Sequence, residues 1–152
     1  MKKIASAAAS TALPDERIIK FIQTRHIMTI ATVDPEGAPY CATLFYAYMP
    51  DENLLVFSSD SHTRHYLDMI RDNRVAAAIA LDTKTVGKIQ GVQITGRVEI
   101  SDPQDSTRIR NAYLKKFPYA ALAELTLWTM RPSAIKFTDN CLCFGKKLLW
   151  FA

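Results

Sequence analysis

The sequence lacks the motifs that mark the common nucleotide-binding and hydrolytic enzymes. Its 152 residues include only five glycines, and no glycine-rich dinucleotide motif, P-loop, nucleophile elbow or metalloprotease helix is present. A phosphate site in this chain must therefore be built from side chains and the start of a helix. The three histidines, His26, His62 and His65, lie in segments of different types, so they indicate no catalytic triad.

Cysteine is also scarce, and long apolar runs are missing. An odd number of cysteines, three, argues against a disulfide framework and favours a reducing compartment. Cys141 and Cys143 are separated by one residue, but Cys41 and the histidines offer no suitably spaced ligands to complete a zinc site. We expect the cysteines to be packing residues, and we expect no metal. No segment approaches the roughly 18 continuous apolar residues of a membrane span, so we expect no membrane partner.

The net charge by itself excludes few classes of ligand or partner. Nineteen Lys and Arg against fifteen Asp and Glu give a net charge of +4, which suits an anionic ligand. The basic residues cluster only in pairs, so we expect no nucleic-acid partner.

The first residues resemble a poor signal peptide, because their apolar region lacks Leu, Val and Phe up to Leu13. We expect residues 1–12 to be disordered or frayed, residues 13–152 to form a single domain, and the protein to be cytoplasmic.

Hydrophobic periodicity predicts a mainly β chain with flanking helices. Because the strands come mainly in consecutive hairpins, a closed antiparallel sheet of six or seven strands is favoured over a parallel one. Gly96 interrupts the apolar row of the clearest strand, which indicates a bulge or bend. The predicted helices cover residues 14–25, 62–71, about 103–116 and 118–125. The predicted strands cover residues 26–33, 38–49, 54–57, 75–81, 89–100 and 147–151, with a further strand pair within 126–139 around Met130-Arg131-Pro132.

The second strand of the first hairpin is apolar on both faces. Tyr40, Leu44 and Tyr48 alternate with Thr43 and Phe45, and neither set is plainly polar. A strand of this kind must be covered on both sides, by the core on one side and by a ligand or a partner chain on the other.

The most informative stretch joins a short strand to a helix. The apolar run 54–57 is followed by four small polar residues, 58–61, and then by the helix 62–71, for which Ser61 is a suitable N-cap. The first backbone N–H groups of a helix lack partners and lie at the positive end of its dipole. Thr63 and Arg64 would add a hydroxyl group and a bidentate cation, so the stretch predicts an anion site. The alternative is a plain capped helix with a solvated arginine.

This order of elements resembles the pyridoxamine 5′-phosphate oxidase-like, FMN-binding split-barrel proteins. The resemblance rests on the hairpin, the Ser/Thr-rich turn with Arg64, the helix that ends in Asn73-Arg74-Val75, and the run GVQITGRVEI at residues 91–100. It covers the chain from about residue 15 to its end. The run from Ile135 to Trp150 is similar to the tail of the uncharacterised bacterial YhbP-like branch, although that branch usually has other residues at positions 141 and 143.

The resemblance implies a six-stranded antiparallel split barrel with flanking helices that forms a homodimer. It also implies FMN in two clefts between the subunits. The phosphate segment of the family falls on Thr63, Arg64 and His65, where the family has a lysine in place of His65. Further cofactor-binding candidates, with Gln90 and Gly91 coming from the partner subunit, are Thr43, Leu44, Phe45, Ser58, Ser59, Gln90, Gly91 and Lys146.

These expectations leave two functions open. The first is an FMN-dependent oxidoreductase acting on an unidentified small molecule. FMN itself carries the hydride or electrons, so no catalytic side chain is required and none is named. The second is a non-catalytic flavin- or haem-binding protein on the same fold. Each candidate residue also has a structural alternative: Thr43 and Phe45 as packing residues, Gln90 as a solvated strand residue, and Lys146 as a surface charge.

Overall fold

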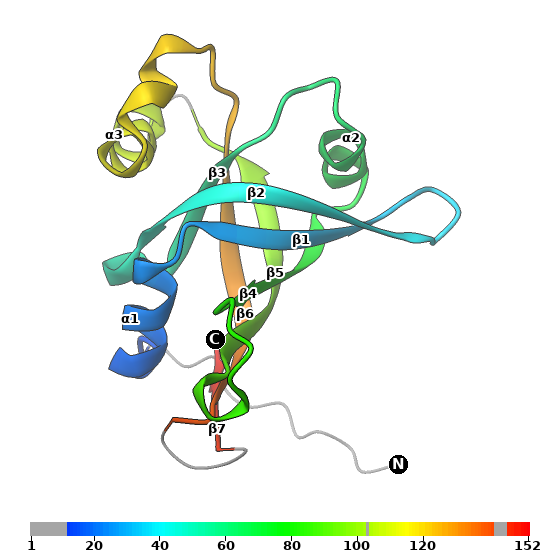
Figure 1. Cartoon of the computed structure of the whole chain (residues 1–152). Coiled ribbons are helices and arrows are strands. Elements are labelled where there is room, and N and C mark those ends of the chain that lie inside the picture. The colour runs from blue at the N-terminus through cyan, green and yellow to red at the C-terminus, as the bar shows by residue number, and fades with distance from the viewer. Residues whose placement is uncertain (1–11, 103, 142–145) are drawn as a thin grey trace.

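The structure is a computed structural model, and it describes residues 12–102, 104–141 and 146–152. One antiparallel sheet contains all seven described strands, in the order β3-β2-β1-β4-β5-β6-β7. An additional pairing of β3 with β6 closes the first six strands into a barrel, and β7 extends the sheet beyond β6 (Figure 1). The strands are β1 (Ile27–Val33), β2 (Pro39–Met49), β3 (Leu54–Ser58), β4 (Arg74–Ala80), β5 (Gln90–Ile100), β6 (Leu127–Asp139) and β7 (Lys147–Phe151).

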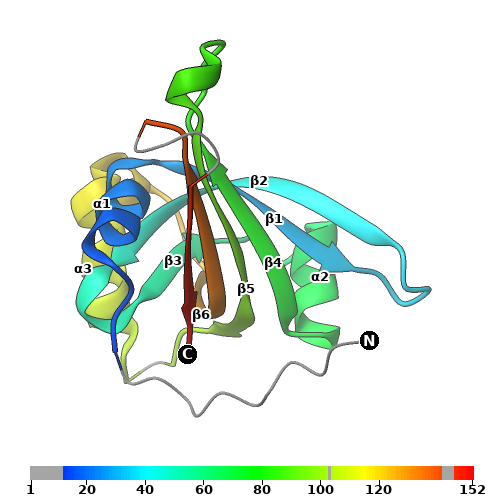
Figure 2. The ribbon, with the colours of Figure 1, turned by 90° about the horizontal axis from the view of Figure 1, so that it is seen from below.

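Three α-helices surround the barrel: α1 (Glu16–Thr24), α2 (Arg64–Arg71) and α3 (Ser106–Lys116). Figure 2 shows α2 on one side of the barrel and α1 with α3 on the other. The Asp15 side chain caps α1 by accepting from the Arg17 N–H at 2.9 Å. The buried face of α1 packs into the barrel core, where the rings of Phe21 and Phe137 lie 5.2 Å apart. Three short 3-10 helices occupy Pro50–Glu52, Val86–Lys88 and Pro118–Leu122.

Lys116, in the last turn of α3, ties that helix to the end of α1. Its ammonium group donates to the backbone carbonyl of Arg25 and lies 4.7 Å from the centre of the Tyr46 ring. Burial lowers the pKa of Lys116 to about 8. The lysine therefore joins two helices that are far apart in the sequence.

The barrel interior follows from strand alternation, because successive side chains point to opposite faces. On β1, Met28 and Ile30 point inward and are buried, while Thr29 and Ala31 point outward. On β4, Val75, Ala77 and Ile79 are buried and the alanines between them are exposed. The outer faces of β4 and of the middle of β1 therefore carry small side chains.

A β-bulge lies at Gly96, as the sequence predicts. The pairing of β5 with β6 shifts between Thr95 and Gly96, so Ser133 is an extra residue on β6. A Cβ atom at Gly96 would lie 2.4 Å from the carbonyl oxygen of Arg131, which only glycine avoids. The predicted strand pair around Pro132 is wrong, since Leu127–Asp139 is one continuous strand. Proline is tolerated in it because Pro132 pairs with Gly96 at the bulge, where the regular ladder is interrupted.

Two further sequence interpretations are corrected by the structure. Helix α2 starts two residues later than expected, with Thr63 rather than Ser61 at its N-cap. Cys41 and Cys141 are exposed free thiols, so the packing interpretation is wrong for both. Cys143 lies outside the described residues, as does the segment 1–11 that we expect to be disordered or frayed. No helix in the described part of the chain is long and apolar enough to cross a membrane.

Candidate functional site

A chain of polar side chains marks the start of α2. The Thr63 hydroxyl lies 3.2 Å from the Ser59 hydroxyl and 3.3 Å from Nε2 of His65. The same hydroxyl accepts from the Tyr66 N–H at 3.3 Å and donates to the Asp60 carbonyl at 2.8 Å. Ser59 is only 2% exposed, and His65 is 8% exposed. Two hydroxyl groups and one imidazole therefore meet at one helix start.

Backbone donors at this helix start are available to a ligand. Tyr66 N–H is bonded to the capping Thr63 side chain, and Leu67 N–H to the Thr63 carbonyl. The N–H groups of Arg64 and His65, at the first two helical positions, have no acceptor among the described residues. Hydroxyl groups and free amide donors at the positive end of a helix dipole fit a phosphate group.

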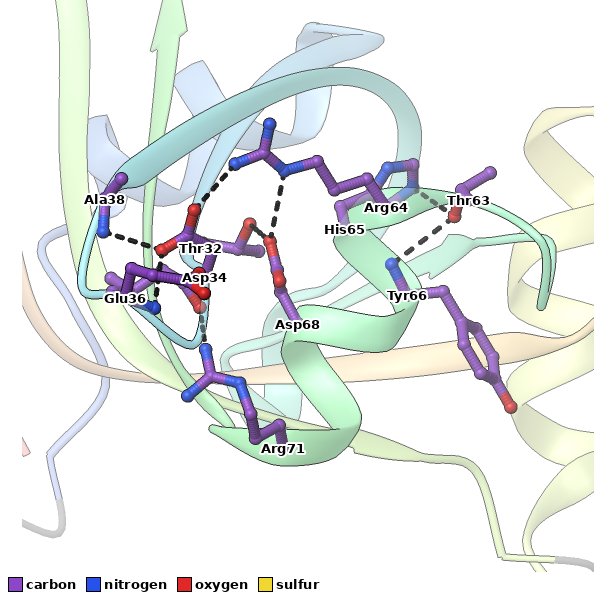
Figure 3. Close-up of polar contacts among 11 residues, drawn as sticks. Thr32, Asp34, Glu36, Ala38, Thr63, Arg64, His65, Tyr66, Asp68 and Arg71 are labelled. Atoms are coloured by element: carbon purple, nitrogen blue, oxygen red, sulfur yellow. Dashed lines mark hydrogen bonds and ion pairs between the residues drawn. The ribbon is translucent and has the colours of Figure 1, made fainter.

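Arg64 extends away from this polar chain, toward the β1–β2 hairpin (Figure 3). Its Nη2 lies 3.1 Å from Oδ2 of Asp34, and its Nε lies 4.0 Å from Oδ2 of Asp68. The guanidinium also stacks over the Tyr40 ring, 4.4 Å from its centre. An anion that uses Arg64 must therefore share it with two carboxylates, and must draw it back toward Thr63.

The carboxylates that hold Arg64 also connect α2 to the hairpin. Buried Asp68 accepts from the Thr32 hydroxyl at 2.9 Å, and Arg71 donates to the Val33 carbonyl. Asp34 accepts from two N–H groups of its own turn, those of Glu36 and Ala38, at 3.0 and 2.8 Å (Figure 3). The position of the arginine is thus set by elements 30 residues apart in the sequence.

His65 acts here as a hydrogen-bonding group more than as a cation. Burial lowers the pKa of His65, and the nearby Asp68 carboxylate only partly opposes this effect. A pKa below the usual value leaves the imidazole uncharged at neutral pH. It therefore does not replace the permanent charge of the lysine that the family resemblance implies at this position.

The candidates on β2 do not share one face. Thr43 and Phe45 point outward and are exposed, and the Phe45 ring lies 5.3 Å from the Phe117 ring of the segment after α3. Leu44 points inward and packs against the barrel core. A ligand on the outer face of β2 can contact the side chains of Thr43 and Phe45, whereas the Leu44 side chain faces the opposite way. Ser58, at the end of β3, is half-buried and pairs with Leu127.

Gln90, Gly91 and Lys146 lie at the other end of the barrel. The Gln90 amide donates to Oδ2 of Asp139 at 3.0 Å, and the carbonyl of exposed Lys146 accepts from the Asp139 N–H at 3.2 Å. Asp139 is the last residue of β6, while Ser58 pairs with the first, so about 40 Å of strand separates the two groups. A single chain does not bring these residues to the start of α2.

Sequence reasoning identified none of the three side chains that contact the Arg64 guanidinium. Asp68 could have been found, because residues four apart on a helix lie on one face. Asp34 and Tyr40 carried no such signal, since they belong to a hairpin that only the folded chain brings to α2. Among the described residues, no group of three or more His, Cys, Asp or Glu is placed to hold a metal ion.

The fold and the sequence define the class of this protein. The family model for pyridoxamine 5′-phosphate oxidase matches residues 14–139. The chain belongs to that family.

Its sequence relatives narrow the assignment to one branch. A UPF0306 protein of Klebsiella pneumoniae is 37% identical over 131 residues, which cover 86% of this chain and 88% of the relative. The UPF0306 protein YhbP of Salmonella choleraesuis is also 37% identical over 131 residues, with the same two coverages. A UPF0306 protein of Yersinia pestis is 30% identical over 139 residues, covering 90% of this chain and 94% of the relative. This chain is thus a YhbP-like member of the family.

Solved structures share the fold at low sequence identity. A structure described as a heme binding protein from Mycobacterium smegmatis superposes with a TM-score of 0.75 at 17% identity, over 86% of this chain and 55% of that one. A FAD-binding protein from Mesorhizobium loti superposes with a TM-score of 0.66 at 15% identity, over 79% of this chain and 88% of that one. At these identities the similarity establishes the split-barrel fold alone.

Proposed function

We propose that this protein is an FMN-binding flavoprotein, with the flavin phosphate held at the start of α2. The observation that carries the proposal is the pair of free N–H groups of the first two helical residues, which lie beside the Ser59 and Thr63 hydroxyls. Arg64 supplies the formal positive charge when it is shared with Asp34. The family to which the chain belongs, and the FAD-binding fold neighbour, support a flavin over other phosphorylated ligands.

We further propose that the working unit is a homodimer. The outer face of the barrel carries a shallow groove of about 390 Å³, lined by small side chains on β1 and β4 and by two larger apolar ones on β7. Exposed Leu149 and Phe151 are 62% and 54% accessible, which is costly unless a second chain covers them. The family resemblance implies that Gln90 of one subunit contacts the flavin bound to the other. Within one chain Gln90 lies far from α2, so this contact would require a second copy. The groove residues are Thr29, Ala31, Cys41, Ala76, Ala77, Ala78, Gln93, Ile94, Thr95, Ala134, Ile135, Lys136, Leu149 and Phe151.

The proposed activity is an oxidoreduction of a small molecule. Bound FMN supplies the hydride or electron transfer, and the protein supplies position and electrostatics. The α2 start would anchor the phosphate, while exposed Thr43 and Phe45 offer a polar and an apolar contact on the outer face of β2. An exposed, unpaired Cys41 suits a reducing compartment, which leads us to expect the protein in the cytoplasm.

A second candidate is a carrier that binds flavin or haem without catalysis. It is favoured by the fold neighbour described as a heme binding protein. Haem requires an axial ligand, and exposed His26 and His62 are the histidines outside the polar chain of α2.

The absorption spectrum of the purified protein, followed by a flavin titration, separates these candidates. A flavin band, or tight uptake of added FMN, supports the first proposal. A Soret band identifies haem and would show the flavin proposal to be wrong. A colourless protein that ignores both ligands would refute both candidates.

A further inference from the structure

Three arginines lie side by side on the outside of the barrel, one on each of three neighbouring strands. The register places Arg74 of β4 opposite Arg97 of β5, and Arg97 opposite Arg131 of β6. All three residues are exposed. Neighbouring strands are about 4.8 Å apart, so this arginine row is about 10 Å long. Like charges directly opposite one another destabilise a sheet, and the row therefore calls for a compensating anion.

The described residues compensate the row only in part. Arg74 forms a two-bond ion pair with Asp72, with distances of 3.0 and 2.7 Å. Arg97 donates to the side-chain oxygen of Asn73 at 2.9 Å. The guanidinium of Arg131 has no acceptor among the described residues, and Glu99, which points outward next to the row, forms no ion pair with any of them. Two guanidinium groups are thus held in place, while the third is free to bind.

A groove accompanies the row. It measures about 680 Å³ and is lined by all three arginines together with the hydroxyl-bearing Thr95 and Ser133. The β-bulge between Gly96 and Pro132 shapes this groove, because the extra residue Ser133 turns its hydroxyl to the Thr95 carbonyl at 3.0 Å. Bulges commonly re-aim side chains next to functional sites.

We propose that the arginine row binds a small phosphorylated molecule that carries two linked phosphoryl groups. Guanidinium forks match phosphate oxygens in a bidentate way, and two forks one strand apart can hold a diphosphate between them. In this arrangement Arg97 and Arg131 bind the ligand, and Arg74 provides positive charge at the end of the row. The ligand replaces the repulsion between the arginines with attraction to each of them.

This site is distinct from the proposed flavin site. The groove beside Arg64 is lined by the hairpin turn and the outer face of α2, and it shares no residue with the groove of the arginine row. The row borders the apolar outer face, so a second copy bound there would form one wall of the groove. The diphosphate proposal does not require that FMN binds.

Isothermal titration of the full chain with inorganic pyrophosphate at low salt tests the proposal. We expect saturable binding that weakens at least tenfold in Arg131→Gln and in Arg97→Gln, because each variant loses one charge-assisted contact. Inorganic phosphate should bind at least tenfold more weakly than pyrophosphate. Arg110→Gln, a matched change on α3 outside both grooves, should bind pyrophosphate within twofold of the parent. Arg64→Gln, a change in the proposed flavin site, distinguishes the two anion sites, because only pyrophosphate bound at the start of α2 should lose affinity in it.

Several results would overturn the proposal. No binding by the parent, or an equal loss in Arg110→Gln, would leave the row as ordinary surface charge. A loss of pyrophosphate affinity in Arg64→Gln would show that the anion binds at the start of α2. Equal affinities for phosphate and pyrophosphate would show that the arginines do not bridge two linked phosphoryl groups. An oligonucleotide that binds while pyrophosphate does not would assign the row to nucleic acid instead. Arg131→Gln is the decisive variant, since the Arg131 guanidinium has no partner among the described residues whose loss could disturb the fold.

Discussion

Replacing Arg64 with glutamine tests whether this residue binds the flavin phosphate. The Arg64 side chain is half-exposed, and it pairs with Asp34 at 3.1 Å. A phosphate at the start of α2 would gain a charge-assisted contact from Arg64, but that contact comes at the expense of the existing ion pair. The effect of Arg64→Gln on the free energy of FMN binding is therefore the difference between the free energies of these two interactions.

Both interactions have typical sizes. A hydrogen bond to a charged group contributes about 1.5–3 kcal/mol, and a solvent-exposed ion pair about 0.2–1 kcal/mol. The net contribution is about 1–2 kcal/mol, so Arg64→Gln should weaken FMN binding about five- to thirtyfold. Asp34→Asn should act in the opposite direction. It frees Arg64 from its competitor and should strengthen FMN binding about 1.4- to fivefold.

The assay is a fluorescence-quenching titration of the parent and both variants with FMN and with riboflavin. Riboflavin lacks the phosphate, so all three proteins should bind it almost equally. If Arg64→Gln binds FMN as tightly as the parent, Arg64 does not contact the phosphate. If it loses affinity for both ligands alike, the change has damaged the ring pocket or the fold, and the phosphate assignment is wrong.

Three further predictions concern the barrel and its surface. Gly96→Ala should lower the free energy of unfolding by about 2–3 kcal/mol in urea denaturation, because a Cβ would meet a backbone carbonyl at 2.4 Å. Gly87→Ala, where a Cβ meets nothing within 4 Å, is its control, and an equal loss in both would contradict the close-approach argument. The parent should sediment at twice the 17.1 kDa monomer mass, and Ala78→Arg on the outer face should yield monomers; a monomeric parent would rule out the dimer. Burial lowers the pKa of Lys116 to about 8, against an ordinary value of 10.5. The unfolded chain therefore binds more protons between these values, and stability should rise as pH increases from about 8 to 10.5. The same rise in Lys116→Met would show that another group causes it.

Local patterns in the sequence were sufficient to predict most of the elements. The alternation of Val92, Ile94 and Val98 with polar residues predicts β5, and these residues do face the core. The bulge at Gly96 was predicted because glycine in the apolar row of a strand indicates a bend or a close backbone approach. The start of α2 was recognised as a possible anion site from Thr63 and Arg64. Each of these signals comes from residues within a few positions of one another.

Contacts between distant segments could not be predicted in this way. The sequence predicted a strand pair around Pro132, yet the bulge opposite Gly96 accommodates this proline within one continuous strand. The sequence placed Leu44 on the opposite face from Thr43 and Phe45 but did not show which of the two faces is inside; in the structure Leu44 packs against the core. Which face of a strand is inside depends on how the sheet closes, and the pairing of β3 with β6 decides that.

The sequence by itself determined most of the helices and strands, the closed antiparallel class of the sheet, and the chemistry available at the start of α2. Only the tertiary structure decided which charges meet. It turned Arg64 toward Asp34, whose hairpin packs on α2, and it aligned Arg74, Arg97 and Arg131 through the registers of three strands. The physical reason is the separation along the sequence of the residues that interact. Helix caps and strand alternation are set by neighbouring residues, whereas an ion pair depends on pairing and packing between segments that the chain brings together only when it folds.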